Sequence, residues 1–598
     1  MQKAFGYLSY KYTQREDGTM EITGYRGDAE ELEIPAKLDG RRVTSIGNGV
    51  FDGCSDLSSI TIPDGVTRIG EYAFVDCRRL TDIAIPDSVT EIGAHAFDRC
   101  VDLSSITIPK GVTRIGEYAF AACRSLTNVV ISESVAEIGA HAFDDCTDLI
   151  SIVLPDSVTQ IGANPFFGCK HLTDIRIVPD SPTFAIVEDA LSFKWEGRLI
   201  FCLRAFEKTS YEIPNGIRII GEGAFNLCKN LTDITIPDGV TEIGAHAFTD
   251  CSCLSSVMLP DSVTKIGEYA FANCKRLTNV VLPDSVTEIG ANPFAGCEHL
   301  TDICIAPDSS AFAVVEDALS FKRDDRLICC FRAFEKTSYE IPNGIRVIGD
   351  SVFSFCRNLR SITIPDSVTR IGESAFAFCS SLTSVVFPER MTEIGKEAFY
   401  QCSGLTDITI PDSVTEIGAR AFERCTGLSS LRLPDSVTRI GEEAFVGCTR
   451  LTNVVLPDSV TEFGRAVFIA CRSLTDVVVP DGVTEIGERM FWACRGLASI
   501  TIPDSVTKIG ACAFEDCAGL TSITIPDSVT EIGDKAFSMC ESLTSLTIPC
   551  GVTQIGYGAF EYCKNLTLTV ERDSYAAQYA RDNGVNYTYP DSWDWLNG

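Results

Sequence analysis

The chain contains few of the residues on which catalysis usually depends. Its 598 residues include only five histidines, four tryptophans and six methionines. The histidines fall at two repeated positions: His95, His141 and His246 share one, and His171 and His299 share the other. No histidine is gathered with a nucleophile, and neither a phosphate-binding loop nor a Gly-x-Ser-x-Gly motif occurs. We therefore expect no catalytic residue, no cofactor and no enzymatic activity.

Metal sites, membrane spans and nucleic-acid contacts are disfavoured for similar reasons. Cys251-x-Cys253 and Cys329-Cys330 lack a second pair at zinc spacing. No apolar run approaches the roughly 20 residues that span a bilayer. The 50 basic and 82 acidic residues give a net charge of −32, and an acidic surface repels phosphate backbones. The sequence thus predicts no metal, no membrane insertion and no nucleic acid.

Cysteine, in contrast, is abundant, and twenty of the 27 cysteines recur in one frame of 23 residues. The frame runs from Cys54 to Cys169, from Cys228 to Cys297 and from Cys356 to Cys563. Each of these cysteines follows a Phe by three residues and a Gly by seven. A fixed period of this length is typical of a solenoid, whose coils bury their apolar side against their neighbours.

The recurrence of the cysteines predicts that they point inward and stack on their equivalents. Buried thiols behave as small apolar groups. Neighbouring coils lie about 4.8 Å apart, within reach of a disulfide, so spacing alone does not forbid bridging. Bridging alternate pairs would make the coils unequal, and the number of cysteines is odd. We therefore favour a ladder of reduced thiols.

Residues 411–433, PDSVTEIGARAFERCTGLSSLRL, represent one coil. Leu428 to Leu433 spell L-x-x-L-x-L, in which Leu431 and Leu433 should face inward. Pro-Asp-Ser supplies a turn, and Val414 and Ile417 begin a second apolar strip. Ala421, Phe422 and Cys425 follow at helical spacing, which predicts a single helical or 3₁₀ turn on the outer face.

The recurring text I-P-D-S-V-T-x-I-G-x-x-A-F-x-x-C-x-x-L-T-x-I closely resembles the BspA-like, or Treponema pallidum type, leucine-rich repeats. The resemblance covers nearly the whole chain. It implies a β-dominated leucine-rich repeat solenoid of the α/β class, a right-handed superhelix with one long parallel sheet. The strand ends from Ile34 to Ile548 predict about 22 coils. Ser or Gly stands where better-known repeats carry Asn, so the usual asparagine ladder is absent.

The departures from the frame divide the chain into seven segments. They are an N-terminal β cap (1–46), coils (47–177), an expanded coil (178–213), coils (214–305), a second expanded coil (306–341), coils (342–570) and a helical cap with an aromatic tail (571–598). FGYLSYKY and MEITGY in the first segment alternate like strands, and SYAAQYARDNG in the last predicts a helix ending at Asn583-Gly584. No Pro/Ser/Gly-rich linker occurs, which predicts one continuous body.

The two expanded coils carry nearly the same text and predict the same structure. FAIVEDALSF and RLIFCLRAF read as the strands of a β-hairpin, and so do their counterparts in the second copy. Outside them, RIGEYAF alternates with EIGAHAF. This alternation places unlike charges at Arg68, Glu91, Arg114 and Glu137 on successive coils.

Candidate binding residues come from the insertions, the sheet face and the tail. Projecting hairpins would gather aromatic residues, namely Phe193, Trp195, Phe201, Phe321 and Phe331, although these could equally pack the core of their own coil. We expect Trp195 to be the most exposed of them. On the sheet face the candidates are Asp174, Arg176, Asp233, Asp302 and Arg432, against the alternative of a solvated β-face. Trp593 and Trp595 mark the tail.

These features favour a non-enzymatic protein-binding scaffold. The family resemblance implies a bacterial surface or secreted protein with an adhesin-like role, binding a host matrix or cell-surface protein. The alternative is a structural protein that self-associates into a surface layer or filament; an enzyme is a remote third. The start of the chain lacks the basic and apolar stretches of a signal peptide, so a cytoplasmic location remains open.

Overall fold

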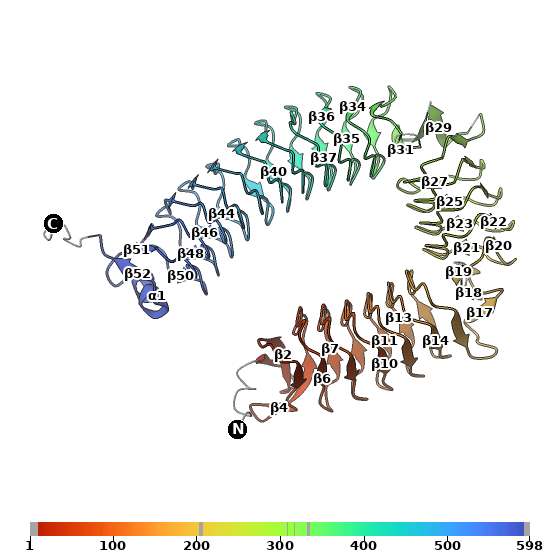
Figure 1. Cartoon of the computed structure of the whole chain (residues 1–598), viewed down its shortest axis with the longest axis horizontal. Helices are drawn as coiled ribbons and strands as arrows, with labels where there is room; N and C mark the ends of the chain where they lie inside the picture. Colours follow the sequence, from red (N-terminus) through yellow and green to blue (C-terminus); the bar gives the residue numbers. More distant parts are fainter. Residues whose placement is uncertain (1–9, 203–206, 308, 316, 332–334, 591–598) are drawn as a thin grey trace. The chain divides into compact units, whose positions relative to one another are not determined.

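The computed structural model describes residues 10–202, 207–307, 309–315, 317–331 and 335–590. The chain divides into two compact units, Met1–Ala306 and Pro307–Gly598. Each unit is a stack of coils joined by short parallel strands, as the leucine-rich repeat fold predicts (Figure 1). The division between the two units falls at the start of the second insertion, where the regular text stops.

Each coil contributes two short strands to two separate parallel ladders. In the coil at residues 411–433 these are β38 (Glu416–Ile417) and β39 (Ser430–Arg432). Ile417 pairs with Ile440 and Leu431 with Val454, each one coil further on. Leu431 and Leu433 are buried, whereas Ser430 and Arg432 are exposed, which confirms the predicted alternation.

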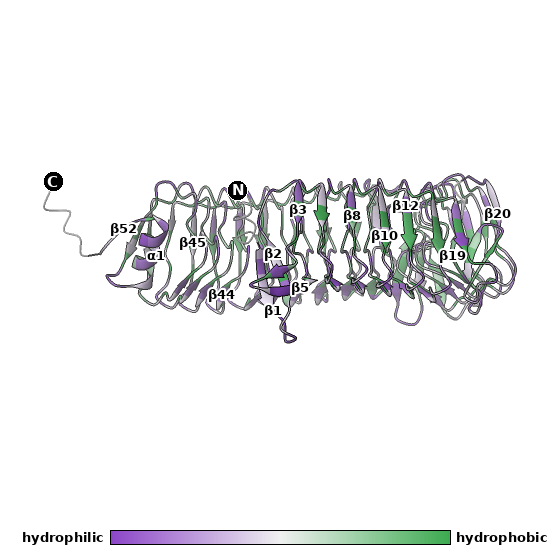
Figure 2. Ribbon diagram, turned by 90° about the horizontal axis from the view of Figure 1, so that it is seen from below, coloured by the Kyte–Doolittle hydropathy of each residue, from purple (hydrophilic) through white to green (hydrophobic). Residues whose placement is uncertain are grey.

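The longer strands of unit 1 form the sheet face most clearly. They are β10 (Ser105–Ile108), β12 (Asn128–Ile131), β14 (Ser151–Leu154) and β16 (Asp174–Ile177), paired in that order. Figure 2 shows β10 and β12 coloured as hydrophobic, because Ile and Val dominate their sequences. β-branched residues suit this pleated, half-buried position.

The outer wall of each coil is built of tight turns, and the predicted helical turn is wrong. Arg420 and Arg424 adopt left-handed φ values of 55° and 57°, which no α- or 3₁₀-helix contains. The backbone N–H groups of Arg420 and Phe422 donate to the next coil, to Glu442 and Ala444, over 2.8 and 2.9 Å. The spacing of three or four residues between the apolar side chains therefore reflects successive tight turns and not one face of a helix.

Phenylalanine and cysteine fill the interior behind this wall. Phe353 and Phe376 stack with ring centroids 5.1 Å apart and planes 1° apart, and equivalent pairs recur along both units. Cys425 is fully buried, and its Sγ donates to the carbonyl of Phe399 over 3.1 Å. The interior ladder cysteines are buried, as their recurrence predicts, and the structure holds them as free thiols. Burying each aromatic ring stabilises the stack by about 1.5–3 kcal/mol.

Each insertion contains three antiparallel strands instead of the predicted two. In unit 1, β17 (Phe184–Val187), β18 (Ala190–Phe193) and β19 (Arg198–Cys202) pair in order, and β19 continues in parallel with β21 (Ile219–Ile220). The text FAIVEDALSF is itself a hairpin, because Glu188 and Asp189 form its turn with φ values of 50° and 69°. The predicted pairing of the second half of this text with RLIFC is confirmed.

The second insertion repeats this arrangement in unit 2. Its strands are β29 (Phe312–Val315), β30 (Ala318–Phe321) and β31 (Arg326–Cys330), followed by β33 (Val347–Ile348). β29 pairs with β30 and β30 with β31, both antiparallel, and β31 is parallel to β33.

The predicted caps are present at the ends of the described chain. β1 (Tyr10–Gln14) is antiparallel to β2 (Met20–Tyr25), which is parallel to β5 (Arg41–Ile46), so a β cap covers the first coil. α1 (Tyr575–Asn583) follows the last coil, with Ser574 as its N-cap and left-handed Gly584 as its C-cap. The first half of FGYLSYKY, and the tail residues Trp593 and Trp595, lie outside the described residues.

Candidate functional site

The insertion aromatics mostly belong to the core. Phe193, Phe201 and Phe331 are buried and Phe321 is half-buried, so the packing interpretation holds for these four. Trp195 is 71% exposed, which confirms that it is the most accessible of the set. Its ring contacts Phe193 with centroids 6.1 Å apart. Among these five aromatic residues, Trp195 is therefore the one presented to solvent.

A cluster of Lys, Asp and Tyr holds each insertion to the following coil. In unit 2, Tyr339 donates to Asp317 Oδ1 over 3.0 Å, and Lys336 both pairs with this carboxylate and lies 4.7 Å above the Tyr339 ring. In unit 1, Tyr211 donates over 2.8 Å to the carbonyl of Glu188, in the turn of the hairpin. Burial raises the pKa of both tyrosines. A hydroxyl that holds its proton so firmly is a structural donor, not a base.

The sheet-face candidates are exposed but are not gathered into one site. Arg176 Nη2 lies 2.7 Å from Asp174 Oδ2, so these two neutralise each other within β16. Asp233 and Asp302 lie on separate strands of unit 1, β22 (Asp233–Thr235) and β28 (Asp302–Cys304). Arg432 lies on β39 of unit 2. Exposed apolar residues accompany them, above all Met258 in unit 1 and Val386 in unit 2, at 82% and 75% exposure.

An aromatic stack on the outer wall of unit 1 escaped the sequence analysis. Tyr72, His95, Tyr118 and His141 lie face to face on four successive coils, with centroids 4.5–4.8 Å apart. His95 Nδ1 also lies 3.0 Å from Asp98 Oδ2. The alternation of EYAF with AHAF in the sequence indicates this stack, because residues 23 apart lie next to each other on neighbouring coils. These histidines therefore have a packing role.

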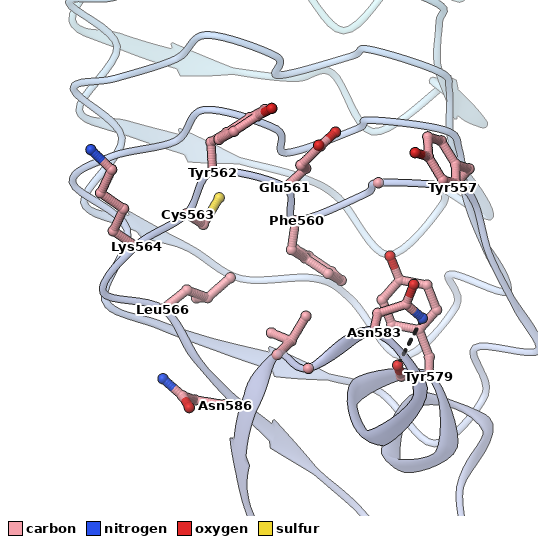
Figure 3. A pocket seen from close by; sticks show the side chains of 13 residues that line it. Tyr557, Phe560, Glu561, Tyr562, Cys563, Lys564, Leu566, Tyr579, Asn583 and Asn586 are labelled. Carbon is pink, nitrogen blue, oxygen red and sulfur yellow. Dashed lines mark hydrogen bonds between the residues drawn. The ribbon is translucent and has the colours of Figure 1, made fainter. Parts of the chain in front are cut away.

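The C-terminal end of unit 2 contains a groove of about 400 Å³ between the last coil and α1. Figure 3 shows Tyr562, Lys564 and Leu566 on one side and Tyr579 and Asn583 of α1 on the other. Cys563, the last rung of the thiol ladder, is half-buried at this groove. Its hydrogen bond with Cys540 lowers the pKa of Cys563, whereas burial raises the pKa of the interior ladder thiols such as Cys425.

Neither a metal centre nor a membrane span is found in the described part of the chain. There, no three His, Cys, Asp or Glu side chains come together as metal ligands. No helix in those residues has the length and apolar character needed to cross a bilayer.

Comparison with known proteins identifies the family. The family described as "BspA type Leucine rich repeat region (6 copies)" matches residues 44–177, 201–314, 329–452 and 438–567. These segments cover most of the chain, so the chain belongs to this family of leucine-rich repeat proteins. Such proteins generally mediate protein–protein interaction and are typically found at the surface or secreted. No protein with a curated functional description matches the chain.

Solved structures of bacterial leucine-rich repeat proteins are similar to this chain. A leucine rich cell surface protein from Faecalibacterium prausnitzii A2-165 is 28% identical, covering 76% of this chain and 93% of its own, with a TM-score of 0.31. A leucine-rich repeat protein from Bacteroides ovatus is 27% identical, covering 79% and 94%, with a TM-score of 0.28. The leucine rich repeat protein of T. pallidum is 26% identical, covering 41% and 88%, with a TM-score of 0.24.

Proposed function

We propose that this chain is an adhesin-like bacterial scaffold, acting at the cell surface or after secretion, that binds a protein of a host matrix or host cell without catalysing a reaction. The observation that carries the proposal is the exposure of Trp195 on the first insertion. Tryptophan is enriched among the residues that dominate binding energy, and Trp195 is more exposed than Trp492, the other tryptophan that the structure describes.

A difference between the two insertions at one position supports this proposal. They share almost the same text, but Arg323 stands in the second where Trp195 stands in the first. The supporting cluster of Lys, Asp and Tyr is present in both. The fold therefore does not require a tryptophan at this position. An indole that the scaffold does not need, held on a rigid three-stranded support, suits the recognition of a partner.

The test is binding of the full chain to a panel of purified extracellular-matrix proteins by surface plasmon resonance. Trp195→Arg places the residue of the second insertion in the first, so it should fold normally. We expect it to weaken binding by about tenfold or more, as for an interface hot spot. A matched Arg323→Ala variant should bind as the parent does. Binding to no matrix protein, or equal binding by Trp195→Arg, would contradict the proposal.

Self-assembly is the competing function, and sedimentation separates it from adhesion. An adhesin remains a single species as its concentration rises and forms a defined complex with its ligand. A layer-forming protein grows into polymers with concentration, in the absence of any ligand. Surface labelling of intact producing cells with an antibody against the chain tests the location.

A further inference from the structure

A groove on the outer wall of unit 2 departs from the regular repeat. It encloses about 520 Å³ and follows the turns around the ladder cysteines of five successive coils. Its lining includes Arg357, Phe378, Gln401, Ser403, Arg424 and Thr426. Neither the sheet face nor the first insertion contributes to it, so it is a separate surface from the one that carries the proposed function.

Phe378 supplies an aromatic ring to the lining of this groove, and Phe355 of the preceding coil stacks on it. Phe355 and Phe378 each precede a ladder cysteine, and their rings stack with centroids 4.4 Å apart and planes 6° apart. Phe355 is 47% exposed. Both residues have a left-handed φ of 62°, a conformation that bulky residues rarely adopt. Most other coils use small or polar residues at this position, for example Asn273 and Gly447, although Tyr562 is a further aromatic residue there, so the repeat itself does not call for an aromatic ring.

Arginines add positive charge to a chain that is acidic overall. The guanidinium of Arg357 lies 6.0 Å from the centre of the Phe355 ring. Among the residues that the structure describes, no carboxylate forms an ion pair with Arg357. Arg424 lies 3.6 Å from Glu423, and 58% of its side chain is still exposed. The groove lining contains these two arginines and no acidic residue, in a chain with 82 acidic and 50 basic residues.

The geometry of the rings decides between possible ligands. Sugars and nucleic-acid bases stack on the open face of an aromatic ring. Here Phe355 covers one face of the Phe378 ring, and Tyr400 packs against the same ring with centroids 5.2 Å apart and planes 80° apart. A guanidinium matches a carboxylate with two parallel hydrogen bonds. Arg357 and Arg424 lie three coils apart, roughly 15 Å, and an extended peptide covers this distance in about four residues.

We propose that this groove binds an extended acidic peptide segment of a partner protein, with two carboxylates about four residues apart and an apolar side chain between them. The carboxylates pair with Arg357 and Arg424, and the apolar side chain lies against Phe378. The proposal adds a second contact surface to a protein-binding scaffold. It does not depend on the matrix ligand or on Trp195.

The experiment measures binding of a fluorescein-labelled peptide, Asp-Ser-Leu-Ser-Asp, to the full chain by fluorescence anisotropy. We expect saturable binding that Arg357→Ala weakens about tenfold and that Phe378→Ser weakens similarly, because a charge-assisted pair and an apolar contact are lost. Raising the salt concentration should also weaken binding. The matched control is Arg472→Ala, which removes the same charge from the same position of a coil without exposed phenylalanines; its affinity should equal that of the parent.

Other outcomes count against the proposal. Equal binding of Lys-Ser-Leu-Ser-Lys, or binding of an oligogalacturonate but not of the acidic peptide, overturns it. An affinity unchanged in both Arg357→Ala and Phe378→Ser overturns the location, provided that both variants keep the circular dichroism spectrum of the parent. Trp195→Arg should leave peptide binding unchanged, so failure of the peptide and failure of matrix binding are told apart.

Discussion

The hydroxyl of Ser436 donates a hydrogen bond of 2.6 Å to the backbone carbonyl of Val414, one coil earlier. The serine of most Pro-Asp-Ser turns makes the equivalent bond, as in Ser88 to Val66, Ser262 to Val240, Ser459 to Val437 and Ser528 to Val506, whereas the hydroxyl of Ser157 has no partner among the described residues. We call this series the serine ladder. It links neighbouring coils at the turn, in a family member that has no asparagine ladder.

Replacing Ser436 with Ala should loosen the two coils that this bond joins. The carbonyl of Val414 loses its side-chain donor in a half-buried place, at a cost of about 1 kcal/mol. Long repeat arrays do not unfold in one step, so the measurement is hydrogen exchange of the local amides. Exchange should quicken about fivefold in residues 411–440 and stay constant elsewhere. Ser430→Ala, on the exposed sheet face, is the control, and equal effects from the two variants would contradict the role of the ladder.

The parts of the fold that follow from the 23-residue repeat could be predicted from the sequence. The parts that depend on contacts between neighbouring coils could not. The inward direction of Phe422 and Cys425 followed from their recurrence. The helical turn did not form, because spacing of three or four residues also arises from successive tight turns. The sequence singled out Trp195 as the most exposed insertion aromatic, but it left open whether Phe193 packs into its own coil, because only the packing decides that. The stack of Tyr72 on His95 required residues of different coils to be aligned.

The chain should lose stability in alkaline solution. Burial raises the pKa of Cys379, Cys448 and Cys494 to about 12, above the ordinary thiol value of 9.0. Above pH 9 the unfolded chain loses these protons while the folded chain keeps them, so folding stability falls as pH rises. The free energy of unfolding is unaffected by these thiols below pH 9. Between about pH 9 and pH 12, each of them lowers it by about 1.4 kcal/mol per pH unit.

Thermal unfolding followed by circular dichroism between pH 8 and 10.5 measures this loss. The double variant Cys448→Ala, Cys494→Ala should show a shallower decline of the unfolding temperature than the parent. Cys550→Ala is the control, since Cys550 is exposed and makes no part of the thiol ladder. A decline that is equally steep in the double variant and the parent would assign the alkaline sensitivity to other groups.

The two insertions should respond differently to loss of the same hydroxyl. Tyr339 donates to the buried carboxylate of Asp317, whereas Tyr211 donates to the backbone carbonyl of Glu188. Hydrogen bonds to charged groups are stronger, so Tyr339→Phe should cost about 2 kcal/mol and Tyr211→Phe about 1 kcal/mol. Hydrogen exchange in β29–β30 and in β17–β18 reports each loss locally. If Tyr211→Phe costs more than Tyr339→Phe, the Asp317 carboxylate is stabilised by Lys336 alone.

Cysteine labelling should follow exposure and the neighbouring charge. Cys304 and Cys550 are exposed, whereas Cys425 and the other interior rungs are buried. Cys304 Sγ donates to Asp302 Oδ2 over 3.2 Å, and this hydrogen bond raises the pKa of the Cys304 thiol. A thiol reacts through its thiolate, so iodoacetamide at pH 7.5 should label Cys550 first, Cys304 more slowly and Cys425 only after unfolding.

The variant Asp302→Asn isolates the electrostatic part of this order. It removes the negative charge that holds the proton on Cys304 and leaves the exposure of both thiols as it was, so labelling of Cys304 should become about three- to tenfold faster. Labelling of Cys550, followed in the same digest by mass spectrometry, should not change and serves as the internal reference. If Cys304 keeps its slow rate in Asp302→Asn, strand packing rather than the carboxylate limits its reaction, because charge was the only feature altered.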